Sequence, residues 1–278
     1  MSSSLKVRTL SGIVFVVVMV CGLVLNRYVF AALVCAMIVS MMLEFYRMTI
    51  GRGRHRLSKG LMMTAGVVLF ALMFLSEATG VQTRYLPVSM ILVMASMTAM
   101  LFEKDKTTFT DFAFIATGFL YIALPLCLST IISFRDGVFD GTLLLCFFII
   151  IWCSDIGAYT LGMAFGQREG SRKLCPDISP KKSWTGFWGG LLLSVLASCV
   201  VHWAGLLDVP LVHCIILGIL MSLGGLAGDL FESMWKRSYG LKDSGNAIPG
   251  HGGLLDRFDS TLIAMPVGAI YLALFNLL

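Results

Sequence analysis

Apolar residues along this chain form long runs that short polar stretches interrupt. A helix needs about 20 mostly apolar residues to cross a bilayer, and nine runs approach or exceed that length. These runs lie at about 9–26, 28–49, 61–80, 85–102, 112–134, 142–166, 185–207, 211–231 and 255–278. The pattern therefore predicts an all-α polytopic membrane protein with about nine transmembrane helices, folded as a single integral membrane domain over residues 1–278.

The composition agrees with this fold class. Hydrophobic residues make up 58% of the chain and charged residues only 13%, whereas a soluble domain is about one quarter charged. No polar stretch is long enough for a folded domain outside the membrane. The eight cysteines show no CxxC spacing and all but Cys175 fall in apolar runs, so they are expected to be buried thiols. The net charge of +5 is spread over short loops, which argues against nucleic-acid binding.

Lysine and arginine are distributed unequally between the predicted loops. With nine spans, 18 of the 21 cations fall at the N-terminus and in the loops on its side, and only Arg27, Arg84 and Arg135 fall on the other side. Cytoplasmic loops carry the excess of cations, so the N-terminus is predicted to be cytoplasmic and the C-terminus outside. Lys6 and Arg8 would also suit a signal peptide, but no small-residue cleavage site follows, so the first span is expected to be retained.

The stretch from Ser233 to Ser260, here called the polar segment, is the most polar part of the chain, and it contains the predicted active-site loop between helices 8 and 9. It holds four cations, three carboxylates, one histidine and five glycines: Lys236, Arg237, Lys242, Arg257, Asp243, Asp256, Asp259, His251, Gly240, Gly245, Gly250, Gly252 and Gly253. A basic loop that merely anchors the chain at the membrane surface would not need this density of charge and glycine, so a functional site is favoured.

Three carboxylates are predicted to converge at one end of the last two spans. Asp229 ends span 8, and Asp256 and Asp259 open span 9, where a spacing of three places them on one helix face. Oxygen ligands without clustered Cys or His suit a hard cation such as Mg²⁺. Beside Lys, Arg and glycine-rich backbone they indicate phosphoryl or nucleotidyl transfer, although neither GxxxxGK[ST] nor GxGxxG is present. The residues alone predict a metal-dependent enzyme that acts on phosphates at the inner leaflet.

Asp155 lies in the middle of another apolar run. A carboxylate at that depth costs about 3 kcal/mol on insertion scales, so it requires a partner, a proton or a water-lined cavity. It is expected either to line the substrate cavity or to be a neutral side chain that hydrogen-bonds between helices. The small residues Gly157, Ala158 and Gly162 allow both close helix packing and room for a ligand.

The end of span 8 carries further polar residues. If its helix continues past Asp229, then Ser233 and the pair Lys236–Arg237 share a face with that carboxylate. Glu232 either supports this face or marks a solvated helix end, and the sequence leaves both open.

The stretch 167–184 is basic and is predicted on the same side as the polar segment. Ser179, Lys181 and Lys182 stand just before span 7. They follow either from the positive-inside rule, with Trp184 at the membrane interface, or from a phosphate clamp beside the polar segment. The clamp is favoured because both stretches share one side.

Four other ionisable residues carry no predicted chemistry. Glu44 and Glu77 lie near the ends of apolar runs, where a structural role is expected, and His202 and His213 are expected on the outer side.

Four blocks of the polar segment resemble the signature of the phosphatidate cytidylyltransferases. They read Ser233-x-x-Lys236-Arg237, Lys242-Asp243-Ser244-Gly245, Pro249-Gly250-His251-Gly252-Gly253 and Asp256-Arg257-x-Asp259-Ser260. Gly228-Asp229-Leu230 with Glu232-Ser233, Asp155-x-Gly157-Ala158-Tyr159 and Ser179-Pro180-Lys181-Lys182 are similar to further family blocks. The catalytic portion is thus expected at about 141–278, after less family-specific helices at about 1–140. Gln167 and Thr185 depart from the family's usual residues, which affects only peripheral phosphate contacts.

The resemblance implies that CTP and phosphatidate react to give CDP-diacylglycerol and pyrophosphate, through in-line attack of the phosphatidate phosphate on the CTP α-phosphorus. Asp229, Asp256 and Asp259 would hold Mg²⁺. In the family this site is described as a pair of metal ions. The triphosphate would be neutralised by Lys236, Arg237, Lys242, Arg257, Lys181 and Lys182. His251 would assist the reaction or cap the glycine turn. The other residues assigned to substrate binding are Asp155, Ser179, Ser233, Asp243, Gly245, Gly250, Gly252 and Gly253.

The expected partners are CTP, phosphatidate, the lipid bilayer and, in a homodimer, a second copy of the chain, with no nucleic acid. The expected location is a bacterial plasma membrane with the active site on its cytoplasmic face. Two other functions stay open: a CTP-dependent lipid kinase, which would transfer the γ-phosphate, and a membrane transporter that uses intramembrane Asp155. The lack of an evident inverted repeat and the concentration of polar residues at one surface argue against the transporter.

Overall fold

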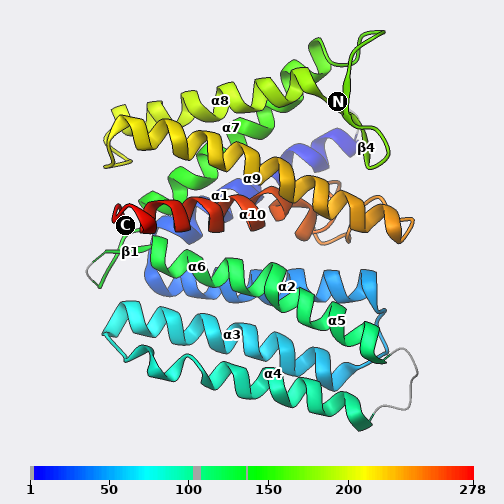
Figure 1. Ribbon diagram of the computed structural model, residues 1–278, viewed down its shortest axis with the longest axis vertical. Coiled ribbons are helices and arrows are strands. Elements are labelled where there is room, and N and C mark those ends of the chain that lie inside the picture. The colour runs from blue at the N-terminus through cyan, green and yellow to red at the C-terminus, as the bar shows by residue number, and fades with distance from the viewer. Residues whose placement is uncertain (1–2, 103–107, 136) are drawn as a thin grey trace. The chain divides into compact units, whose positions relative to one another are not determined.

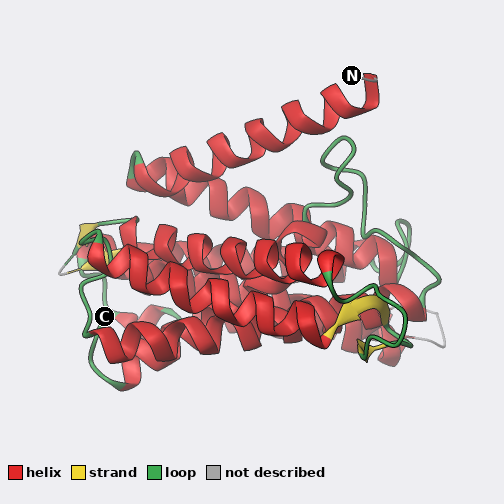
Figure 2. Ribbon diagram, turned by 90° about the horizontal axis from the view of Figure 1, so that it is seen from above, coloured by secondary structure: helices red, strands yellow, loops and turns green. Residues whose placement is uncertain are grey.

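The computed structural model describes residues 3–102, 108–135 and 137–278 of the chain. Within these ranges eight helices are long and apolar enough to cross a membrane, and strands are confined to two short pairs (Figure 2). The first predicted span is represented by a shorter apolar helix, Thr9–Val24. The prediction of an all-α polytopic membrane protein is confirmed. Lys104 and Lys106, which contribute to the predicted charge bias, lie outside the described residues.

The chain divides into two compact units. Unit 1 comprises Met1–Asp140 and Asp243–Arg257, and unit 2 comprises Gly141–Lys242 and Phe258–Leu278. The polar segment therefore contributes residues to both units, and each unit is described separately below. The prediction of a single integral membrane domain stays a prediction.

Unit 1 is a helical bundle that contains the first six helices. These are α1 (Ser3–Val24), α2 (Arg27–Thr49), α3 (Arg56–Thr79), α4 (Val88–Ala99), α5 (Thr108–Gly118) and α6 (Leu124–Ile132), with the short turns η1 (Thr83–Tyr85), η2 (Met100–Phe102) and η3 (Phe119–Ala123) and the strand pair β1 (Phe134–Arg135) and β2 (Val138–Phe139). Helix α3 packs against α2, α4 and α6, and α2, α3 and α4 lie side by side (Figure 1). The core of unit 1 is rich in buried aromatic and methionine side chains, among them Phe30, Phe70 and Met42.

Asn26 explains why the first two apolar runs form separate helices. Its side chain accepts a hydrogen bond from the backbone N–H of Tyr28 at 2.8 Å, which is the geometry of an N-cap. Such a cap satisfies one of the free N–H groups at a helix start. The cap thus marks Arg27 as the start of a new helix, α2.

Unit 2 contains α7 (Thr142–Ala164), α8 (Trp184–Trp203), α9 (Leu211–Ser238) and most of α10 (Leu255–Leu274), with a hairpin of β3 (Lys173–Cys175) and β4 (Ser179–Ser183). Helix α8 packs against both α7 and α9 (Figure 1). The hairpin occupies the basic stretch 167–184, for which the sequence predicted no regular structure.

Small residues bring α7 and α8 into backbone contact. A Cβ atom added at Gly157 would collide with the carbonyl oxygen of Gly189, and one added at Gly186 would lie 2.8 Å from the carbonyl oxygen of Ala158. Helices in membranes commonly approach closely through such positions. The structure thus shows the packing role that the sequence allowed for Gly157 and Ala158.

The two ends of the polar segment are helical. Helix α9 continues to Ser238, seven residues beyond the predicted end at 231, and α10 begins at Leu255. The part without regular helix is therefore residues 239–254, here called the connecting loop. Because α9 continues, Asp229, Ser233 and Lys236–Arg237 are all carried by one helix, as the sequence required for a shared face.

Candidate active site

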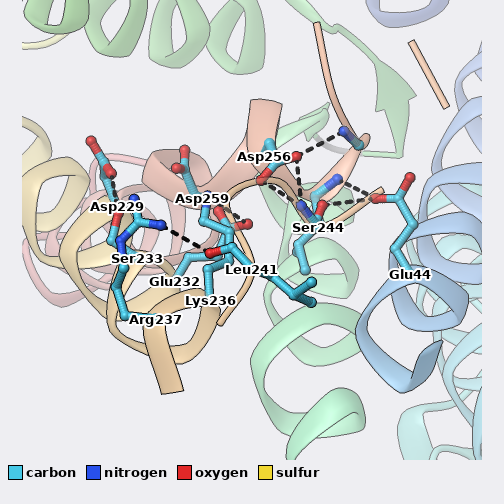
Figure 3. A network of polar contacts seen from close by, with 12 residues as sticks. Glu44, Asp229, Glu232, Ser233, Lys236, Arg237, Leu241, Ser244, Asp256 and Asp259 are labelled. Atoms are coloured by element: carbon cyan, nitrogen blue, oxygen red, sulfur yellow. Dashed lines mark hydrogen bonds and ion pairs between the residues drawn. The ribbon is translucent and has the colours of Figure 1, made fainter. Parts of the chain in front are cut away.

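Asp229 of α9 is held by two polar side chains of unit 2. One of its carboxylate oxygens, Oδ2, lies 2.7 Å from Lys182 Nζ, and the other, Oδ1, accepts a hydrogen bond from Ser233 Oγ at 3.2 Å (Figure 3). Lys182 lies on β4, directly before Ser183, which caps α8 by accepting from the Gly186 N–H at 3.2 Å. The cap fixes the backbone at the end of β4, from which the Lys182 side chain extends.

Three carboxylates of unit 2 interact electrostatically: Asp155 of α7, Asp229 of α9 and Asp259 of α10. Asp259 and Asp229 repel the charge of Asp155, whereas Lys182 attracts it, and Asp229 also repels Asp259. Like charges that interact in this way are unfavourable unless a cation or a proton offsets them. The structure therefore brings two of the three predicted metal ligands near each other, with Asp155 and Lys182 beside them.

Gly228 permits the close approach of the helices that carry Asp229 and Asp259. A Cβ atom at Gly228 would collide with the backbone carbonyl oxygen of Asp259, and one at Gly224 would lie 2.9 Å from the Cα atom of Ala264. These glycines leave room for backbone contact between α9 and the part of α10 in unit 2. The small residues near Asp229 thus allow the backbones that carry the two carboxylates to approach each other.

Glu232, whose role the sequence left open, is not a solvated helix end. It is 0% exposed, forms an ion pair with Lys236 Nζ at 3.3 Å and interacts with the carboxyl group of Asp259. Lys236 is itself buried. The charge of Lys236, predicted to neutralise a triphosphate, is directed at Glu232 in this structure.

Asp256 belongs to unit 1, where it holds the connecting loop. Its two carboxylate oxygens accept hydrogen bonds from the backbone N–H of Ser244 at 3.0 and 2.9 Å, and Oδ2 also accepts from the Gly253 N–H at 2.7 Å (Figure 3). The residue is 9% exposed. The structure shows Asp256 as an acceptor for loop amides, and its role as a metal ligand stays a prediction.

Two of the predicted substrate-binding glycines border carboxylates of unit 1. A Cβ atom at Gly245 would lie 2.9 Å from Glu44 Oε1, and one at Gly252 would lie 2.8 Å from Asp256 Oδ2. Gly252 also has a φ of +85°, which residues other than glycine rarely adopt. Packing within the protein accounts for both glycines, and their contact with phosphate stays a prediction.

His251 forms part of a tight turn in the connecting loop. Its backbone N–H donates to the carbonyl of Ile248 at 2.9 Å, and Gly250 beside it has a φ of +77°. The ring atom Nδ1 lies 3.0 Å from Ser11 Oγ, and that hydroxyl donates to the carbonyl of Pro249 at 2.9 Å. A serine hydroxyl has one hydrogen, so His251 Nδ1 is the donor of this pair. The structure shows His251 in a turn, and its assistance in catalysis stays a prediction.

The other predicted site residues lie nearer the surface. Arg237 Nη1 donates to the carbonyl of Leu241 at 2.9 Å and so closes the end of α9. Ser179 is half-buried on β4, and four side chains are exposed: Lys181, Lys242, Asp243 and Arg257. The three cations among them, Lys181, Lys242 and Arg257, are accessible to an anionic substrate, and their role in binding it stays a prediction.

Gln167, one of the two departures from the family pattern, braces the β3–β4 hairpin. Its Nε2 donates to the carbonyl of Lys181 at 2.8 Å, and its Oε1 accepts from Lys173 Nζ at 2.8 Å. Thr185 places its hydroxyl 3.0 Å from that of Ser183. Both residues thus support the stretch that carries Lys181 and Lys182.

The carboxylate oxygens of Asp229 and Asp259 in unit 2 are hard donors of the type that Mg²⁺ prefers. Within the described ranges, no group of three or more His, Cys, Asp or Glu side chains is arranged to hold a metal alone. Mg²⁺, however, usually keeps several waters and binds through one or two carboxylates together with substrate phosphates. Asp229 and Asp259 provide such a pair of hard donors, and their mutual repulsion is a conflict that a cation would remove.

Comparison with known proteins covers nearly the whole chain. A family model described as the cytidylyltransferase family matches residues 6–275. The chain is 31% identical over 278 residues to the phosphatidate cytidylyltransferase of Bacillus subtilis (strain 168), which covers 98% of this chain and 99% of that protein. The chain belongs to the cytidylyltransferase family. Proteins named phosphatidate cytidylyltransferase from Staphylococcus epidermidis RP62A and Staphylococcus aureus COL are each 36% identical, over 65% of both chains.

In this cytidylyltransferase, Glu44, for which the sequence predicted a structural role, contacts the polar segment. It is 5% exposed and accepts hydrogen bonds from the Leu254 N–H of the connecting loop at 3.0 Å and from the Leu255 N–H at the start of α10 at 2.8 Å. A carboxylate in an apolar run was the available signal, but the position near a helix end favoured a simple structural role.

The two histidines expected far from the site do contact other groups of the cytidylyltransferase. His213 Nδ1 lies 2.8 Å from the hydroxyl of Tyr271, and His202 Nδ1 lies 3.2 Å from the carbonyl of Leu207. Both sit at the connection between α8 and α9, the end of α9 opposite to Asp229.

Proposed function

We propose that this cytidylyltransferase transfers CMP from CTP to phosphatidate and releases pyrophosphate. The observation that carries the proposal is the match over 98% of the chain to a relative named phosphatidate cytidylyltransferase. The arrangement of Lys182, Asp229 and Ser233 supports it, because an anionic substrate and its cation need both signs of charge at one place. The connected membrane helices suit an acceptor that is itself a lipid.

The reaction forms one phosphorus–oxygen bond and breaks another. A phosphate oxygen of phosphatidate attacks the α-phosphorus of CTP, and the bond from that phosphorus to the bridging oxygen of the β-phosphate breaks as pyrophosphate leaves. The attacking phosphate is already an anion, so the chain does not have to supply a strong base. The main task of the protein is to position two anions and to offset the charge that they bring together.

The exposed cations are proposed to bind the triphosphate. Lys181, Lys242 and Arg257 are accessible, whereas Lys236 is engaged with Glu232. Lys182, which is paired with Asp229 at 2.7 Å, would hold that carboxylate in place and share its charge with an incoming phosphate. Lysine acts as a point charge toward phosphate.

Asp229 and Asp259 are proposed to bind Mg²⁺ together with the CTP phosphates, and Asp256 is included because it stands one turn before Asp259 on α10. When bound, the cation would neutralise the triphosphate and stabilise the leaving pyrophosphate. Measurement of the metal stoichiometry in the presence of CTP distinguishes one bound ion from two.

Purified protein with CTP, phosphatidate and Mg²⁺ tests the function directly. In parallel reactions CTP carries the radiolabel on its α- or γ-phosphate, and the lipid is then extracted. Label from the α-phosphate in the lipid is the expected result. Label only from the γ-phosphate would instead identify a lipid kinase. Lipid without any label would contradict both transfer reactions and favour a transporter that uses Asp155.

The site is proposed to lie on the cytoplasmic face of a bacterial plasma membrane. In a variant without native cysteines, Cys introduced at exposed Asn246 should react with an impermeant thiol reagent only from the cytoplasmic side, because the cation-rich loops are predicted there. Cys introduced at exposed Asn276 should react only from outside. Reaction of both positions from one side would contradict the nine-span topology.

Asp155→Asn is expected to lower activity by about 10²-fold while the protein remains folded and inserted. The substitution removes a carboxylate that interacts with Asp229, Asp259 and Lys182, and we take as a guide the loss of about 10²–10³-fold that follows removal of one oxyanion-hole donor. Turnover per folded protein and thermal stability in detergent are the two measurements. Unchanged turnover with altered stability would assign Asp155 to helix packing alone.

A further inference from the structure

We infer that Glu44 is a positioning residue for the transfer reaction, through its hold on the connecting loop and on the start of α10. Its Oε1 accepts from the Leu254 N–H at 3.0 Å, and its Oε2 accepts from the Leu255 N–H at 2.8 Å and from Ser244 Oγ at 3.3 Å. Figure 3 shows the carboxylate directed at Ser244. All of these residues belong to unit 1. The inference rests on the proposed function.

The burial of Glu44 indicates a specific role for its charge. The residue is 5% exposed, and a buried carboxylate is unfavourable unless hydrogen bonds compensate for the lost water. Leu254 and Leu255 provide the N–H groups at the start of a helix, which have no partner within the helix and attract negative charge. Glu44 thus acts as a cap for α10 that comes from α2, 211 residues earlier in the chain.

Glu44 and Asp256 bind adjacent groups of the same loop. Ser244 donates its hydroxyl to Glu44 and its backbone N–H to Asp256. The next amide before those bound by Glu44, that of Gly253, donates to Asp256 at 2.7 Å. Movement of the loop away from Glu44 would therefore also displace the groups that orient Asp256.

The connecting loop fits closely around the Glu44 carboxylate. A Cβ atom at Gly253 would lie 2.6 Å from Glu44 Oε2, and one at Gly245 would lie 2.9 Å from Oε1. Both glycines belong to blocks of the polar segment, so this part of the segment is shaped to receive a side chain from α2. The inference gives α2, outside the portion predicted to be catalytic, a role in the reaction.

Glu44→Gln tests the inference, with Glu77→Gln as the matched control on α3. An amide presents one oxygen and one NH₂ group, so its NH₂ would face an N–H donor of the loop. We expect kcat to fall about 10–100-fold, the range found when groups that orient a metal site are removed, with KM for CTP changed much less. Glu44→Asp keeps the charge and should recover part of the loss.

Hydrogen–deuterium exchange separates positioning from general stability. Peptides over 243–257 should exchange faster in Glu44→Gln, whereas peptides from α3 and α4 should be unchanged, because the lost bonds are local to the loop. A kcat within about twofold of Glu77→Gln, or unaltered exchange of the loop, would overturn the inference.

A second variant covers the case in which Glu44→Gln does not fold. Ser244→Ala removes only one of the three bonds, and the loss of about one net hydrogen bond corresponds to roughly a 3–10-fold fall in kcat. A wild-type kcat in Ser244→Ala would then count against the inference. Failure of the wild-type protein to transfer α-phosphate label to lipid would reject the proposed function instead, and that result requires no variant.

Discussion

Asp229→Ala is expected to reduce transfer of CMP to phosphatidate by at least about 10³-fold, the upper end of the loss found when one donor is removed from an oxyanion hole. Asp229 is the carboxylate on which Lys182 and Ser233 converge, and it interacts with Asp259. Without it, the remaining carboxylates cannot fix a cation beside the triphosphate. Asp229→Asn should lose nearly as much, because an amide keeps an oxygen but not the charge.

The measurement is activity as a function of Mg²⁺ concentration, with binding of the metal in the presence of CTP as a second readout. Asp259→Ala and Asp256→Ala should behave in the same way, and Asp243→Ala, in an exposed part of the loop, should lose less. Asp208→Ala is the matched control, since this carboxylate is exposed between α8 and α9. Near-native activity and unchanged metal dependence in Asp256→Ala and Asp259→Ala would show that the metal site is wrongly assigned.

Lys182→Met is expected to reduce activity by about 10²-fold. The lysine forms a 2.7 Å ion pair with Asp229, and both side chains are partly shielded, at 21% and 36% exposed. Its loss leaves Asp229 to face the other carboxylates of unit 2 without its nearest cation. Removal of one preorganised donor from an oxyanion hole costs about 10²–10³-fold, and we expect a loss at the lower end of that range here.

The adjacent lysine provides a close control for that variant. Lys181→Met removes the same side chain one residue earlier, where it is exposed on β4, and should weaken CTP binding several-fold with a smaller effect on kcat. Folding is monitored by detergent-solubilised yield and thermal midpoint. Equal losses in the two variants would indicate that the stretch acts through its overall charge and not through the Lys182–Asp229 pair.

Much of the architecture could be predicted from local sequence. Eight of the nine predicted spans correspond to helices that are long and apolar enough to cross a membrane, because the bilayer imposes the same length on each of them. The predicted boundaries were less accurate where polar residues remain helical. Helix α9 runs to Ser238, since the hydrogen bonds of a helix do not end where its hydrophobicity does.

The candidate site was predicted as a set of residues but not as a set of partners. Asp155, Asp229 and Asp259 were all selected from the sequence, and in the structure they lie within electrostatic range of one another in unit 2. Lys236 and Lys182 were both assigned to phosphate, yet one pairs with Glu232 and the other with Asp229. Charge and spacing identify candidates, but which cation reaches which carboxylate depends on how the helices pack.

The sequence by itself determined that this is a polytopic helical membrane protein with a polar, glycine-rich segment of cytidylyltransferase type near its end. Those features depend on runs of apolar residues and on short motifs, which are local properties of the chain. The tertiary structure alone decided that Glu44 caps α10 and that Lys182, not a cation of the polar segment, pairs with Asp229. These contacts join residues far apart in the chain, and no periodicity or spacing along the sequence specifies which helices will meet.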